Sequence, residues 1–63
     1  MKTARIVYWQ NENHWLGYFE EFPDYQTQGD TLEDLREMLR SLHEDLTSGE
    51  IPGVRRVEEL AVA

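Results

Sequence analysis

Residues 30–46, DTLEDLREMLRSLHEDL, decide the fold. Their apolar members recur at helical spacing, and at about 100° per residue they occupy an arc about 120° wide. These members are Leu32, Leu35, Met38, Leu39, Leu42 and Leu46. We expect Asp30 to cap the N-terminus, with Glu33 completing a capping box. Gly49 is expected to end the helix, and Pro52 forbids its continuation. One amphipathic helix with a single buried face is therefore predicted.

Short segments on both sides of this helix are predicted strands. Residues 4–10 and 15–22 are rich in β-branched and aromatic side chains, and the polar residues 11–14 between them indicate a hairpin. Residues 25–28 are a third candidate, and residues 57–62 are a fourth that follows the helix. The predicted architecture is α+β in the order β-β-β-α-β, with an antiparallel sheet and one amphipathic helix packed on one face.

The first two predicted strands are apolar on both sides, because successive side chains point to opposite sides of a sheet. The alternation sets Ile6 and Tyr8 against Val7 and Trp9, and Leu16, Tyr18 and Phe22 against Trp15 and Phe19. One helix covers only one side, so the other side is either solvated or covered by another chain. We favour another chain, with Trp9, Trp15 and Phe19 as candidates for the side that the helix leaves uncovered.

Length and composition indicate one small acidic domain spanning residues 1–63. So short a chain buries a small core, and we expect a homo-oligomer to reinforce it. There is no cysteine, which excludes disulfides and thiolate metal sites. The net charge of −7 disfavours direct nucleic-acid binding and favours a basic partner, although it is equally expected of a protein that is merely kept soluble.

No membrane-spanning or targeting segment is expected. The apolar run that follows Lys2 and Arg5 includes Gln10 and is far shorter than the ~20 residues that a bilayer requires. The predicted compartment is the cytoplasm.

No enzymatic, metal-binding or cofactor-binding arrangement is predicted. Ser41 and His43 stand two positions apart on the helix and do not face each other. Glu20 and Glu21 are neighbours on a predicted strand, so they point to opposite sides and cannot chelate one ion together. We therefore expect a protein that binds a partner and does not catalyse a reaction.

The polar side of the helix carries charges at regular spacing. Three ion pairs are predicted at i,i+3 or i,i+4 separation: Glu33 with Arg36, Glu37 with Arg40, and Arg40 with Glu44. The acids Glu33, Glu37 and Glu44 are candidate contacts for a partner. The alternative is an ordinary solvated face.

Residues 22–35, FPDYQTQGDTLEDL, resemble the HicB-like antitoxin family. The family is marked by an aromatic–Pro–Asp segment and by a Thr-x-Gly-Asp/Glu-Thr-Leu-Glu-Glu/Asp helix start. Residues 45–53, DLTSGEIPG, are similar to a small-antitoxin subgroup of the same family. The resemblance covers nearly the whole chain.

This resemblance implies a single HicB-like antitoxin domain with a partly eroded RNase H-like fold and no nuclease activity. Family members neutralise HicA-like toxins, which are small basic ribonucleases of bacterial toxin–antitoxin pairs that degrade mRNA, so the implied function is to bind and occlude such a toxin. Many members carry a separate DNA-binding module; here we expect none. The alternatives are an orphan oligomeric protein-interaction module and a residual nuclease that depends on Asp24 or Asp30.

Overall fold

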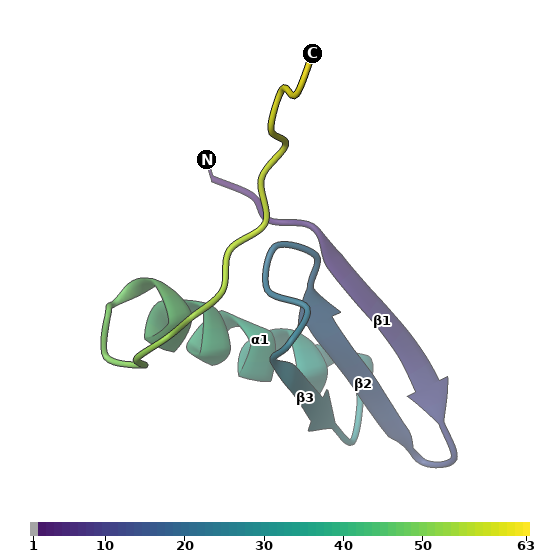
Figure 1. Cartoon of the computed structure of the whole chain (residues 1–63). Coiled ribbons are helices and arrows are strands. Elements are labelled where there is room, and N and C mark those ends of the chain that lie inside the picture. Colours follow the sequence, from purple (N-terminus) through teal and green to yellow (C-terminus); the bar gives the residue numbers. More distant parts are fainter. Residues whose placement is uncertain (1) are drawn as a thin grey trace.

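The structure is a computed structural model that describes residues 2–63, with three strands and one helix (Figure 1). The elements are β1 Ile6–Asn11, β2 His14–Phe19, β3 Gln26–Gly29 and α1 Leu32–Thr47. The strands form one antiparallel sheet in the order β1-β2-β3. The helix lies on one side of this sheet. The predicted α+β fold, with an antiparallel sheet and one helix on one face, is confirmed.

A tight turn joins β1 to β2. Asn11 pairs with His14, so only two residues connect the strands, and one of them, Glu12, has φ 57°. From this turn the register runs without a bulge to Ile6 opposite Phe19. The predicted hairpin is confirmed, with a connection shorter than the four residues expected.

The register assigns each strand residue to one side of the sheet, because directly opposite residues share a side. The side toward α1 holds Ile6, Tyr8, Trp15, Gly17, Phe19 and Thr27. The outer side holds Val7, Trp9, Leu16, Tyr18, Gln26 and Gln28. On the outer side Trp9 and Tyr18 meet edge to face, with ring centroids 6.1 Å apart.

The core lies between α1 and the inner side of the sheet. Its buried side chains are Phe19, Phe22, Leu35, Leu39 and Leu46. Partly buried side chains around them are Ile6, Trp15, Tyr25, Leu32, Leu42, Ile51 and Val54. The predicted apolar helix face is thus confirmed except at Met38, which is 49% exposed. Met38 stands at the margin of the apolar arc, next to Gln28 and Gly29 of the edge strand β3, with no further strand beyond to receive it.

Two glycines let the helix approach the sheet closely. A Cβ atom on Gly29 would lie 2.5 Å from the backbone nitrogen of Leu35 and 2.9 Å from the carbonyl carbon of Asp34. A Cβ atom on Gly17 would lie 3.3 Å from the Cδ2 atom of Leu35. The first turn of α1 therefore rests directly on the backbones of β3 and β2.

The helix begins one residue later than predicted. The N-cap is Thr31, whose hydroxyl oxygen accepts a hydrogen bond from the N–H of Asp34 at 3.0 Å. The prediction of Asp30 as cap with Glu33 as its box partner was wrong. β3 continues to Gly29, the chain bends at Asp30, and Thr31 still has extended backbone angles (φ −126°, ψ 166°), which places the cap one position later. At the other end Gly49 has φ 85°, as expected of the residue after a helix cap.

β2 ends at Phe19, three residues earlier than predicted. The N–H of Phe22 bonds the carbonyl oxygen of Phe19 at 2.9 Å, and the N–H of Tyr25 bonds that of Phe22 at 3.2 Å. This turn directs Phe22 into the core, where it is 1% exposed. Its expected place beside Leu16 and Tyr18 was therefore wrong.

The predicted fourth strand, residues 57–62, does not form. Arg55 pairs with Asp24 at 3.5 Å and Arg56 lies 5.8 Å from the ring centroid of Phe22, which holds this part of the chain near the turn after β2. The chain then runs away from the sheet (Figure 1), and its apolar residues are exposed. Val57 is out of phase with Leu60 and Val62, so the segment has no single apolar side that could bind to a sheet.

We expect Leu35→Ala to lower the free energy of unfolding by about 3 kcal/mol, because it empties a fully buried site between the helix and two strands. Met38→Ala is the matched control on the same helix and should cost less than about 1 kcal/mol. Urea denaturation followed by circular dichroism measures both. Equal losses would contradict the placement of Met38 outside the core.

Thr31→Ala should destabilise the protein by about 1 kcal/mol, because the N–H of Asp34 loses its hydrogen-bond acceptor. Asp30→Ala, one residue earlier, should change stability by less than about 0.5 kcal/mol, since the Asp30 side chain is exposed. The same denaturation experiment separates the two. A larger effect at Asp30 would restore it as the cap.

Candidate interaction surfaces

The outer side of the sheet carries an apolar patch made of Val7, Trp9, Leu16 and Tyr18. Trp9 therefore lies on the side that the helix leaves uncovered, as predicted. Trp15 and Phe19 do not: Phe19 is buried under the helix and Trp15 packs against the core. The prediction that the three share a side was wrong. The hairpin register places Trp9 opposite Leu16, so these two share a side, and Trp15, the neighbour of Leu16 in the strand, points to the other side.

The exposed surface of α1 is divided by charge. Measured from Leu32 at about 100° per residue, the acids fall between about 100° and 220°. They are Glu33, Asp34, Glu37, Glu44 and Asp45, and we call them the acidic stripe. The stripe points away from the sheet, and all of its members are exposed. It contains the three predicted acids, Glu33, Glu37 and Glu44.

The flank of α1 between the acidic stripe and the apolar face is basic. Arg36, Arg40 and His43 fall between about 20° and 80° on the same wheel. Arg36 reaches Glu33 at 3.5 Å, and Arg40 forms an ion pair with Glu37, so two predicted pairs are confirmed. The third was wrong: within the described chain Arg40 pairs with Glu37 and not with Glu44. Helical spacing lets Arg40 reach either Glu37 or Glu44, and its side chain points toward Glu37, the more N-terminal of the two.

A small acidic hollow of about 340 Å³ opens between α1 and β3. It is lined by Gln28, Gly29, Asp30, Asp34, Glu37 and Met38. Met38 thus offers an exposed apolar contact beside three carboxylates. The sequence did not point to Asp30, Asp34 and Met38 as surface candidates, because Asp30 is a good helix cap and Met38 falls within the apolar arc.

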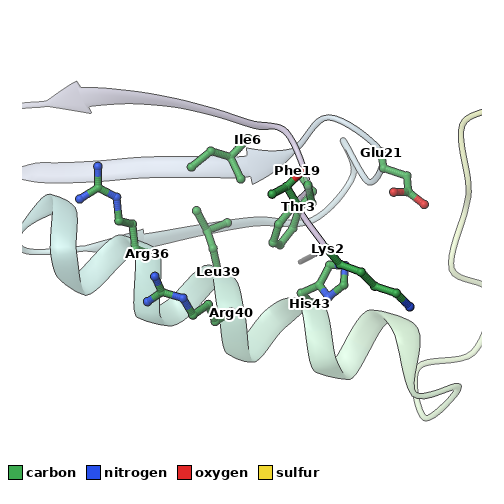
Figure 2. A pocket seen from close by; sticks show the side chains of 10 residues that line it. Lys2, Thr3, Ile6, Phe19, Glu21, Arg36, Leu39, Arg40 and His43 are labelled. Carbon is green, nitrogen blue, oxygen red and sulfur yellow. The ribbon is translucent and has the colours of Figure 1, made fainter.

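A larger groove of about 580 Å³ lies between α1 and the N-terminal segment that leads into β1 (Figure 2). Ile6, Phe19 and Leu39 form its apolar floor. Lys2, Arg36, Arg40 and His43 stand at its sides, together with Glu21. The ring of His43 lies 5.1 Å from that of Phe19, so this histidine occupies the edge of the core.

This groove holds three of the six Lys and Arg residues of an acidic chain. It exists because α1 packs over β3 and β2 and, in the part of the chain that the structure describes, does not lie over β1. The inner side of β1 is consequently open at Tyr8, whereas Ile6 still packs against the core.

Asp24 and Asp30, the acids considered for a residual nuclease, are kept apart by β3. They lie beyond opposite ends of this strand, whose four residues span roughly 10 Å. Asp24 pairs with Arg55 at 3.5 Å, and Asp30 lies 3.5 Å from Nδ1 of His14. Over residues 2–63 the structure shows no group of three or more His, Cys, Asp or Glu side chains placed to hold a metal ion.

Among the described residues, no helix has the length and apolar character required to cross a membrane. Comparisons with protein-family models, with curated proteins and with solved structures found no match to this chain.

The acidic stripe is partly at odds with the stability of its helix. The carbonyl end of a helix carries partial negative charge and favours cations. The last turn of α1 holds no basic residue and carries Glu44 and Asp45. These two acids therefore oppose the helix dipole, and helix stability does not explain their presence.

The double variant Glu44→Gln/Asp45→Asn should raise the free energy of unfolding by about 0.5 to 1 kcal/mol at low ionic strength, because it removes this repulsion. The gain should shrink as salt is added. Glu58→Gln/Glu59→Gln makes the same change in net charge outside the helix and should have little effect. Denaturation midpoints at low and high salt test this, and a loss of stability would contradict it.

Proposed function

We propose that this protein is a non-catalytic antitoxin that binds a small basic toxin of the HicA type and covers it. The proposal joins the HicB-like resemblance of residues 22–35 and 45–53 with the acidic stripe on α1. The stripe is the observation that carries it. The protein acts in the cytoplasm and makes no direct contact with nucleic acid.

The shape of the stripe supports a protein partner. At about 1.5 Å per residue, the helix segment from Glu33 to Asp45 is roughly 18 Å long, comparable with the width of a small protein–protein contact. Charges along such a surface guide a basic partner during encounter and fix its orientation. The basic residues of α1 border the stripe on one side, where Arg36 and Arg40 pair with Glu33 and Glu37.

The acidic hollow adds an apolar contact to the charged surface of the helix. Tight protein interfaces rely on apolar anchors surrounded by polar groups, and exposed ion pairs by themselves contribute little. Met38 is half exposed among Asp30, Asp34 and Glu37, so an Arg or Lys side chain of a toxin could lay its methylene groups on Met38 and its charge on the carboxylates.

The triple variant Glu33→Gln/Glu37→Gln/Glu44→Gln tests the stripe. The matched control is Glu50→Gln/Glu58→Gln/Glu59→Gln, since each variant removes three charges and changes the net charge from −7 to −4. The toxin for this test is the product of the short basic reading frame that the proposal predicts beside the gene. We expect the first variant to bind it at least about tenfold more weakly and the control to bind nearly as the unaltered protein does.

Growth rescue and calorimetry give the two measurements. Co-expression of the unaltered protein should relieve the growth arrest that the toxin causes, and the stripe variant should relieve it less than the control does. Binding by the unaltered protein should weaken steeply with salt, and binding by the stripe variant less so. Equal losses in both variants would show that only net charge matters. Absence of both complex and rescue would overturn the antitoxin proposal.

A further inference from the structure

The two edges of the sheet differ in how they are protected. β3 is four residues long, polar, ends at Gly29 and lies under α1. β1 is six residues long, reads IVYWQN, and contains no charge, proline or bulge. Charges, proline and bulges are the usual means by which proteins prevent an edge strand from pairing with another chain. β1 has none of them.

β1 is also exposed on both of its sides. Val7 and Trp9 on the outer side are 36% and 37% exposed, and Tyr8 on the inner side is 46% exposed. Tyr8 contacts Trp15 of the neighbouring strand, with ring centroids 6.0 Å apart, and α1 does not cover it. The apolar side chains and the free backbone edge thus belong to the same strand.

The backbone groups that face outward can be assigned from the ladder. The N–H of Glu20 bonds the carbonyl oxygen of Arg5, and bonded positions alternate along an antiparallel pair. Arg5, Val7 and Trp9 therefore turn their backbone groups toward β2. Ile6, Tyr8 and Gln10 turn theirs toward solvent, with Tyr8 in the middle.

We propose that β1 pairs antiparallel with β1 of a second copy of this chain, around a two-fold axis at Tyr8, so that the two sheets become one of six strands. In this register Tyr8 lies opposite Tyr8 of the other copy, Ile6 opposite Gln10, and Val7 opposite Trp9. Each backbone group that faces solvent in the single chain then finds a partner. Aliphatic and aromatic residues face each other across the outer side, a stabilising cross-strand combination.

Charge favours a second copy as the occupant. All thirteen acids of the chain lie at or after position 12, whereas residues 2–11 carry two bases and no acid. Two molecules of net charge −7 can therefore meet along this segment without placing acid against acid. The antiparallel arrangement brings the end that holds Lys2 and Arg5 next to the turn that holds Glu12 of the other copy. Arg5 already contacts Glu20 of its own chain at 3.3 Å.

This pairing leaves the acidic stripe of α1 unused. It is independent of the antitoxin proposal, because self-association is measured without any toxin. Two fused sheets also enlarge the apolar surface withdrawn from water, in a chain whose residues 2–63 contribute five buried apolar side chains to its own core.

A charge exchange at the two-fold axis tests the register. Tyr8→Lys or Tyr8→Glu alone would set like charges opposite each other and should raise the dimer dissociation constant at least about tenfold in sedimentation equilibrium. An equimolar mixture of the two should restore association. Gln28→Lys, on the outer side of the edge strand β3, is the control and should leave the dimer unchanged. A monomeric unaltered protein, or a dimer that neither Tyr8 variant weakens, would overturn the proposal.

A second measurement tests the same interface without charged variants, which could disturb the fold. The chain has no cysteine, so Tyr8→Cys introduces one thiol at the proposed axis. Under mild oxidation it should cross-link to a covalent dimer much faster than Gln28→Cys does, because opposite residues of paired strands lie about 5.5 Å apart at their Cα atoms, within disulfide reach. Equal rates for the two variants would exclude this interface.

Discussion

The structure depends on the close contact between the first turn of α1 and the backbone of β3. Gly29 has no Cβ atom, and one would lie within 2.5 Å of the backbone nitrogen of Leu35. Leu35 is completely buried and also reaches Gly17 on the central strand. The helix is therefore held against β3 and β2 at its N-terminal end. Because the packing distance is set by backbone atoms, the position of the helix over the sheet has little freedom.

This contact explains where the groove, the acidic hollow and the charged flanks of α1 lie. A helix held over β3 and β2 cannot also cover β1. The inner side of β1 therefore borders the groove whose apolar floor is formed by Ile6, Phe19 and Leu39. The same placement leaves Met38 overhanging β3, where it is surrounded by acids. The basic flank of the helix thus faces the β1 side, and the acidic stripe faces away from the sheet or toward β3. The two charge types meet along one margin of the stripe, where Arg36 and Arg40 pair with Glu33 and Glu37.

Much of the fold was predictable because it follows from periodicity. The spacing of the apolar helix residues identified Leu35, Leu39 and Leu46 as core, and alternation identified the strands and the sides of Ile6 and Val7. The shared side proposed for Trp9 and Trp15 was an avoidable error. A hairpin that pairs Gln10 with Trp15 necessarily places Trp9 opposite Leu16 and on the other side of the sheet.

Other features depend on tertiary contacts that no local pattern contains. Asp30 and Thr31 are both good helix caps, and the choice between them follows from how far β3 extends. Residues 57–62 have strand-like composition, yet a strand forms only where the edge of a sheet is available, and the contacts of Arg55 and Arg56 hold the preceding chain near the turn after β2. The groove and the acidic hollow arise from the offset of the helix, which the glycine contacts determine and which the sequence alone did not indicate.

The two proposed interfaces are compatible because they use different parts of the molecule. The acidic stripe lies on the helix surface that points away from the sheet, and the β1 edge lies on the strand that the helix does not cover. The charge of the chain follows the same division: two bases and no acid in residues 2–11, and five acids along one stripe of α1. A pair joined through β1 would carry its two acidic stripes on separate helices, so a basic partner could bind each copy without competing with self-association. The two proposals therefore assign the uncharged edge and the charged helix face to different contacts, the first with a second copy of the chain and the second with a molecule of opposite charge.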